Sequence, residues 1–149
     1  MTMQPCPWSV TELLPHRPPM LLLDEVLGFD AEQVQASHTI TATAPFLEAE
    51  GVPGHIGIEY MAQACGAWAG IRARQAGGLP RIGFLLGARG CRLYRAWFRP
   101  GEQLLVSVRL IFQDSTLAGF TGRIDIGGER VAESSLTVYE PPELQGMPV

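Results

Sequence analysis

A long proline-free run constrains the fold more than any other part of the sequence. Residues 55–75 carry alanine and glycine where a surface helix would carry bulky polar side chains, and the run ends at Gly77 and Gly78. Glycines commonly end helices, and a helix that is apolar on nearly every side is buried. We therefore predict one long central helix that other elements must cover.

Segments with strand character lie on both sides of this helix in the sequence. We expect two strands before it and four after it, at residues 20–29, 33–43, 82–94, 103–112, 117–126 and 130–139. Gly127 and Gly128 separate the last two and indicate a tight hairpin, whereas Ser9 and Glu12 form a capping box that starts a short helix. This order predicts an α+β fold with a curled antiparallel sheet wrapped round the central helix.

The composition limits the domain organisation and the classes of function. A chain of 149 residues with 46% hydrophobic residues fits a single domain over residues 1–149, with a core at about 9–140 and a loose tail at 141–149. Its net charge of −4 gives no overall basic field for nucleic acid. All eleven basic residues are arginine, which excludes Schiff-base chemistry on a lysine. Three separated cysteines, no secretory leader and no membrane span predict a cytoplasmic protein.

Glu59 is the only charged residue between His55 and Ile71. A carboxylate in an apolar helix is costly unless it is protonated, paired or turned toward a cavity. His55 and Gln63 lie one turn before and after it, on the same helix face. The helix start at Gly54 offers backbone N–H groups that can hold a carbonyl oxygen gaining negative charge. This cluster suits chemistry at a thioester, and the alternative is that Glu59 only caps the helix or bridges a partner subunit.

The other two histidines have different contexts. His16 lies among prolines, and His38 lies on the apolar side of an alternating strand, where a histidine is usually a hydrogen-bonded core residue. No histidine or cysteine pair has the spacing of metal ligands, and no glycine-rich nucleotide motif is present. We therefore expect neither a metal nor a cofactor.

Two motifs occur together in the chain. Residues 13–24 read LLPHRPPMLLLD, and residues 53–64 read PGHIGIEYMAQA. They resemble the LLPHRxPFLLVD and PGVLILExMAQA segments of bacterial 3-hydroxyacyl-acyl-carrier-protein dehydratases of the FabZ type. RPGE at residues 99–102 resembles a further turn of that family. The similarity spans residues 10–139 and is greatest to the dehydratase-like subgroup of aryl-polyene pathways.

This resemblance implies the hot-dog fold and assigns the family's acidic residue to Glu59. The family's catalytic histidine, in an HFPG segment of the loop before the helix, has no counterpart, because counting back from Glu59 reaches Pro45. His55 and His16 are therefore the candidates for a second catalytic group. Gly54 and Gln63 are the remaining candidates for substrate binding.

The implied reaction is the removal of water from a 3-hydroxyacyl thioester, giving a trans-2-enoyl thioester in fatty-acid or aryl-polyene synthesis. A base must take a proton from Cα, and an acid must help the hydroxyl leave. Two alternatives stay open at this point. The chain is either a non-catalytic hot-dog subunit of an active dehydratase or a thioesterase, which uses the same fold.

The resemblance also implies partners. The substrate would be carried on the phosphopantetheine of an acyl carrier protein, whose acidic helix would dock on basic residues. Arg89, Arg92 and Arg95 are the docking candidates, with the alternative that they pair with nearby glutamates. Because a single sheet leaves strand edges exposed, we expect a homodimer or higher even oligomer, or a heterodimer with another hot-dog subunit.

Overall fold

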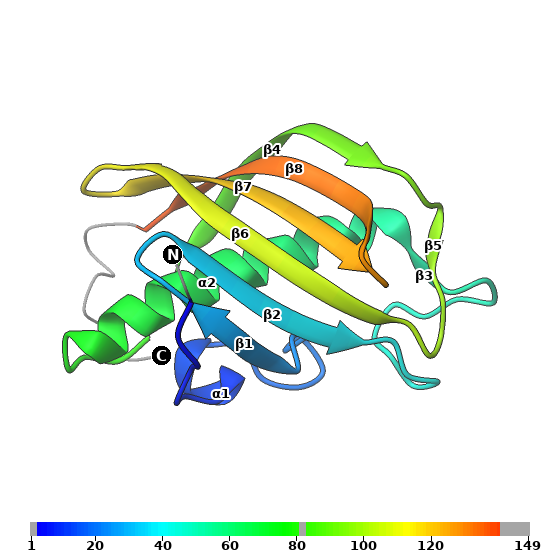
Figure 1. Ribbon diagram of the computed structural model, residues 1–149, viewed down its shortest axis with the longest axis horizontal. Coiled ribbons are helices and arrows are strands. Elements are labelled where there is room, and N and C mark those ends of the chain that lie inside the picture. Colours follow the sequence, from blue (N-terminus) through cyan, green and yellow to red (C-terminus); the bar gives the residue numbers. More distant parts are fainter. Residues whose placement is uncertain (1–2, 81–82, 141–149) are drawn as a thin grey trace.

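A computed structural model describes residues 3–80 and 83–140, and Figure 1 shows how its elements are arranged. A curved antiparallel sheet wraps round the long helix α2 (Gly57–Gln75), as the sequence predicts. The strands are β1 (Glu25–Phe29), β2 (Gln33–Thr39), β6 (Gln103–Gln113), β7 (Leu117–Ile126), β8 (Glu129–Tyr139) and β4 (Phe84–Leu93), in this spatial order.

The short elements lie at the two ends of the helix. α1 (Val10–Leu13) has the predicted Ser9–Glu12 capping box and packs against α2. A 3-10 turn (Gly54–Ile56) leads directly into α2. The ladder of β3 (Val52–Pro53) with β5 (Trp97–Phe98) was not predicted, since two residues on each side leave no periodic pattern in the sequence.

The core lies between α2 and the inner face of the sheet. Tyr60, Met61 and Ala64 of the helix are fully buried against strand residues such as Val106 and Ile124. Gly70 allows α1 to approach, because a Cβ atom there would lie 2.1 Å from the carbonyl oxygen of Leu13. Helix α2 is therefore the scaffold against which both the sheet and the N-terminal segment pack.

The chain differs from the predicted elements at the first strand. The strand begins at Glu25 instead of residue 20, because residues 20–22 hydrogen-bond to a side chain of α2 and not to a neighbouring strand. Gly127 and Gly128 adopt positive φ angles of 58° and 83°, which confirms the predicted hairpin between β7 and β8. The predicted tail at residues 141–149 lies outside the described residues.

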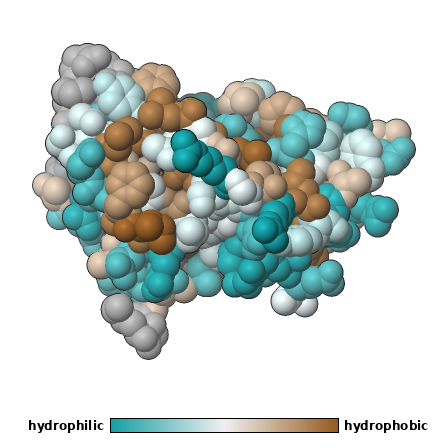
Figure 2. All heavy atoms as spheres, turned by 90° about the horizontal axis from the view of Figure 1, so that it is seen from above, coloured by the Kyte–Doolittle hydropathy of each residue, from teal (hydrophilic) through white to brown (hydrophobic). Residues whose placement is uncertain are grey.

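Strand β4 is one of the two edge strands of the sheet. It pairs with β8 on one side, and its side chains are exposed or nearly so along its length. Phe84, Leu85 and Leu86 are 48%, 38% and 60% exposed. Figure 2, which looks down on this side, shows apolar side chains gathered into a patch.

Within the described residues, no helix is both long enough and apolar enough to cross a membrane.

Candidate active site

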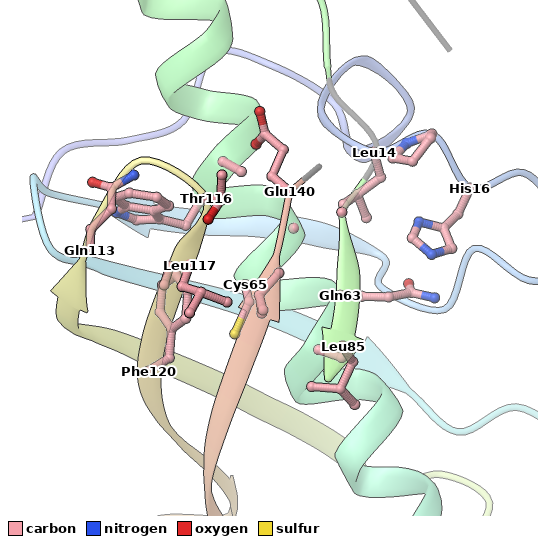
Figure 3. A pocket seen from close by; sticks show the side chains of 18 of the residues that line it. Leu14, His16, Gln63, Cys65, Leu85, Gln113, Thr116, Leu117, Phe120 and Glu140 are labelled. Carbon is pink, nitrogen blue, oxygen red and sulfur yellow. The ribbon is translucent and has the colours of Figure 1, made fainter. Parts of the chain in front are cut away.

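A pocket of about 250 Å³ lies between α2, the N-terminal segment and strands β4, β7 and β8. Figure 3 shows His16 and Gln63 on one side of it and Gln113 and Thr116 on the other. Glu59 also lines the pocket. A carboxylate and an imidazole that are far apart in the sequence therefore meet at one cavity.

One face of α2 forms the floor of this pocket. The lining residues Glu59, Ala62, Gln63, Gly66 and Ala69 follow one another at spacings that keep them on one side of a helix, and Cys65 and Trp68 of α2 also line the pocket. From Glu59 to Ala69 the helix rises about 15 Å, at 1.5 Å per residue. Because Ala62, Gly66 and Ala69 are small, they leave room for an extended chain beside this part of the helix.

His16 belongs to the irregular segment between α1 and β1. Its Nδ1 atom is buried and has no hydrogen-bond partner among the described residues. Burial lowers the pKa of His16 below 6.5, although the charge of Glu59 acts in the opposite direction. The imidazole is therefore neutral near pH 7 and can accept a proton.

Gln63 is 1% exposed, and its amide is used by the protein itself. Its Oε1 accepts a hydrogen bond from the Leu22 N–H at 2.9 Å, and its Nε2 donates to the Met20 carbonyl at 2.7 Å. Both ends of the amide therefore hold the backbone of residues 20–22, and substrate binding by Gln63 stays a prediction.

The hydrogen-bond donors expected at the helix start are not all free. The Gly54 N–H, one of the expected donors to the thioester oxygen, donates to the Ala96 carbonyl at 2.8 Å and is not available. His55 is exposed and does not line the pocket, although it lies one helical turn before Glu59. Of the two candidate histidines, the structure brings only His16 to the pocket that Glu59 lines.

His38 is elsewhere, on β2, with its side chain in the core. It is 5% exposed, its Nδ1 lies 3.4 Å from Oδ1 of Asp24, and its ring centroid lies 4.8 Å from that of Tyr60. Burial lowers the pKa of His38, as expected for a neutral core histidine.

The far end of the pocket was missed by the sequence analysis. It is formed by the turn between β6 and β7, where Asp114 Oδ1 accepts hydrogen bonds from the N–H groups of Thr116 and Leu117 at 3.0 and 2.8 Å. These bonds lower the pKa of Asp114. Such a turn is recognisable from Asp-Ser-Thr, but its position over α2 depends on the curl of the sheet.

Cys65 lines the pocket from α2, and burial raises the pKa of its thiol. It is therefore a protonated, packing cysteine and not a nucleophile. Among the residues that the structure describes, no group of three histidine, cysteine or acidic side chains is placed to hold a metal ion.

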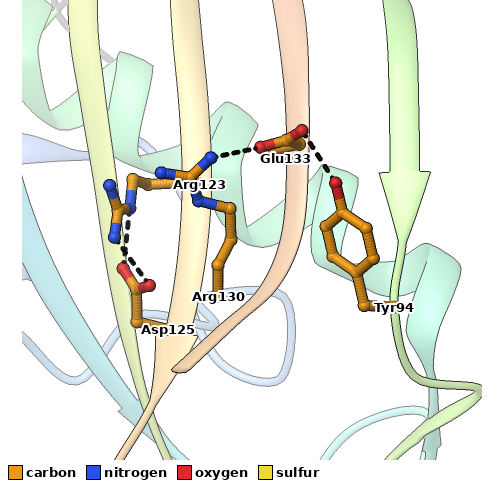
Figure 4. A network of polar contacts seen from close by, with 5 residues as sticks. All are labelled: Tyr94, Arg123, Asp125, Arg130 and Glu133. Carbon is orange, nitrogen blue, oxygen red and sulfur yellow. Dashed lines mark hydrogen bonds and ion pairs between the residues drawn. The ribbon is translucent and has the colours of Figure 1, made fainter. Parts of the chain in front are cut away.

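The three predicted docking arginines have different environments. Arg95 forms an ion pair with Glu102 at 2.6 Å, which offsets its charge, and its part in docking stays a prediction. Arg89 and Arg92 are exposed on β4. Figure 4 shows a neighbouring network on the outer face of the sheet, with ion pairs Arg123–Asp125 and Arg130–Glu133 and a hydrogen bond from Tyr94 to Glu133.

Comparisons with known proteins agree on one relationship. The model of the ApeP-like family, described as ApeP dehydratase, matches residues 8–148. The FabZ 3-hydroxyacyl-acyl-carrier-protein dehydratase of Oceanobacillus iheyensis is 32% identical over 135 residues, which cover 87% of this chain and 94% of that protein. The corresponding enzyme of Anaeromyxobacter dehalogenans is 32% identical over 85% of this chain and 84% of its own length.

Solved structures give the same answer for the fold. The dehydratase heterocomplex ApeI:P of Xenorhabdus doucetiae contains a chain with a TM-score of 0.87 and 31% identity, covering 91% of this chain and 93% of that one. A thioesterase from Streptococcus pneumoniae, solved with coenzyme A, has a TM-score of 0.63 at 13% identity, with 78% of this chain and 84% of that one covered. The second similarity concerns the fold alone.

Proposed function

Because the chain belongs to the ApeP-like dehydratase family and has the hot-dog fold, we propose that Glu59 and His16 transfer the protons of its dehydration reaction. The protein is a dehydratase that removes water from a 3-hydroxyacyl thioester and leaves a trans-2-enoyl thioester. The observation that carries the residue assignment is the convergence of Glu59 and His16 on one pocket.

The proposed chemistry assigns one proton transfer to each group. The neutral His16 imidazole takes the Cα proton, the Cα electron pair forms the new double bond, and the C–O bond at Cβ breaks. The Glu59 carboxyl group gives its proton to the leaving hydroxyl, which departs as water. The step leaves His16 positive and Glu59 negative, and their mutual attraction stabilises this state. A proton transfer from His16 back to Glu59 then restores the starting state.

The small-residue face of α2 supports a place for the acyl chain. Ala62, Gly66 and Ala69 run from Glu59 toward the turn between β6 and β7, so an extended acyl chain can lie along the helix with its thioester end at the acid–base pair. We expect the substrate to arrive on the phosphopantetheine of an acyl carrier protein, without any further cofactor. The three free cysteines support the cytoplasm as the place of action.

The reaction is tested with the purified protein and a 3-hydroxyacyl thioester, following enoyl absorbance. We expect dehydration, and hydration of the enoyl product in the reverse direction. The same assay is repeated after adding a homologous hot-dog dehydratase subunit. Activity only in the mixture would replace this mechanism with that of a subunit that completes a partner's site, and release of free thiol would indicate hydrolysis instead.

We propose that β4 pairs with a second hot-dog subunit, either another copy of this chain or a homologue. An exposed apolar edge strand is a ready surface for strand pairing. The ApeI:P structure is a heterocomplex, which supports such an assembly.

Changing Leu86 of β4 to lysine is expected to weaken this assembly about tenfold or more, because burying one leucine contributes roughly 1.5–3 kcal/mol. Sedimentation across a concentration series measures the effect. Leu27→Lys is the matched control, since Leu27 is 46% exposed on β1 at the opposite edge of the sheet. Equal weakening by both variants, or a monomeric wild-type protein with and without its homologue, would contradict the assignment to β4.

We also propose that Arg89 and Arg92 attract the acyl carrier protein. Reversing both to glutamate should raise KM for carrier-bound substrate about tenfold or more at low salt and much less at high salt, because exposed charges are screened. A small thioester analogue should react at the wild-type rate. Arg109→Glu, an exposed charge on β6, serves as the control for a change in net charge alone. If both substrates lose activity equally, these arginines serve the fold.

A further inference from the structure

The segment that carries His16 has few regular backbone hydrogen bonds. Residues 14–24 join α1 to β1 without forming a helix or strand, and they include Pro15, Pro18 and Pro19. A segment outside helices and β-sheets must find side chains, turns or water as hydrogen-bond partners for its backbone N–H and C=O groups. Its position relative to α2 therefore depends on individual side chains.

The hydrogen bonds near His16 are mostly local. Arg17 donates to the carbonyls of Leu14 and His16, and the Met20 N–H donates to the Arg17 carbonyl. At the far end of the segment, Asp24 accepts a hydrogen bond from the Thr39 N–H at 2.7 Å and anchors that end to β2. None of these bonds connects the segment to α2.

Gln63 supplies that connection. It spans from α2 to the segment with two hydrogen bonds, to Leu22 at 2.9 Å and to Met20 at 2.7 Å. A primary amide presents an acceptor oxygen and a donor nitrogen side by side, and among side chains only glutamine and asparagine carry this group. A carboxylate at this position would place an acceptor against the Met20 carbonyl, and an apolar side chain would leave both backbone groups without partners.

We propose that Gln63 is a positioning residue that fixes His16 relative to Glu59, a role that rests on the proposed function of these two groups. Gln63 follows Glu59 by one helical turn, so the same face of α2 that carries the carboxyl group also holds the histidine segment. One rigid helix thereby sets the separation of the acid and the base, although they come from different parts of the chain.

The first test measures the reaction of Gln63→Met. We expect kcat to fall about 30-fold or more with less than a threefold change in KM, because the substrate pocket persists while the base is displaced. The acid limb of the pH–rate profile should move up toward pH 6.5, the ordinary value for histidine. Gln75→Met makes the same chemical change at the exposed end of α2 and should leave both quantities unchanged.

A double-mutant cycle with His16→Asn separates positioning from general damage. If Gln63 acts through His16, adding Gln63→Met to His16→Asn should cause no further loss of rate. Additive losses would overturn the positioning role. A fully active His16→Asn variant would instead overturn the proposed catalytic pair, so the two failures are distinguishable.

Positioning is also measurable without catalysis. The chain has three histidines, and His16→Asn identifies the imidazole signal of His16 in NMR spectra. In the wild-type protein this signal should titrate below pH 6.5, and in Gln63→Met its midpoint should rise toward 6.5. If Gln63→Met does not fold, Gln63→Asn is titrated instead, since it keeps a neutral amide on a side chain that is one methylene shorter. An unchanged midpoint in a folded variant would overturn the proposal.

Discussion

Replacing Glu59 with glutamine is expected to lower kcat for dehydration roughly 10²- to 10⁴-fold, the usual contribution of a positioned acid or base. The amide keeps the shape of the side chain but cannot give its proton to the leaving hydroxyl. His16→Asn should cause a loss of the same order, because it removes the imidazole that takes the Cα proton. Initial rates with one 3-hydroxyacyl thioester, in both directions, measure the two effects.

His55→Asn is the control for this experiment. His55 is exposed and lies one turn from Glu59 but outside the pocket, so its replacement should change kcat less than twofold. Thermal unfolding shows whether each variant remains folded. A loss for His55→Asn as large as that for His16→Asn would move the second catalytic group from the N-terminal segment to the helix start.

Gly70→Ala is expected to produce the largest loss of stability among conservative changes in α2. The added Cβ would lie 2.1 Å from the Leu13 carbonyl oxygen, so α1 would have to move away from the helix. Overpacking of this kind costs roughly 1–3 kcal/mol, of which the better helix propensity of alanine offsets up to about 1 kcal/mol. We expect a net loss of about 1–2 kcal/mol in the free energy of unfolding, measured by urea denaturation.

The matched control is Gly78→Ala, just beyond the same helix. Its Cβ would be 3.5 Å from the Ala73 carbonyl oxygen, an ordinary contact, and the change should stay within about 0.5 kcal/mol. Equal stabilities of the Gly70 and Gly78 variants would mean that α1 can shift without cost.

The fold could be predicted where neighbouring residues in the sequence determine the backbone conformation. The absence of proline, the apolar surface and the Gly77-Gly78 stop defined α2, and Gly127-Gly128 defined a hairpin. Residues 20–24 were misassigned to a strand because their apolar character reports burial. It does not report which group accepts or donates their backbone hydrogen bonds, and at Met20 and Leu22 that group is a side chain from α2.

The site was predictable in part for a similar reason. Helical spacing and the motif identified Glu59, since both depend on neighbouring residues. The approach of His16 to the same pocket depends on how the N-terminal segment crosses α2, which no spacing in the sequence encodes. We predicted a free donor at the Gly54 N–H because helix starts usually have unpaired N–H groups. In the structure, the Ala96 carbonyl of a neighbouring loop accepts its hydrogen bond.

The position of β4 in the chain has a consequence for synthesis on the ribosome. β4 pairs with β8, which begins 36 residues after β4 ends (129 − 93), so at about 5–20 residues per second β4 waits about 2–7 seconds for its neighbour. During that time an apolar strand has two unpaired edges and is prone to aggregate with other nascent chains. Arg89 and Arg92 interrupt its apolar character with charge, which is how gatekeeper residues keep such strands soluble.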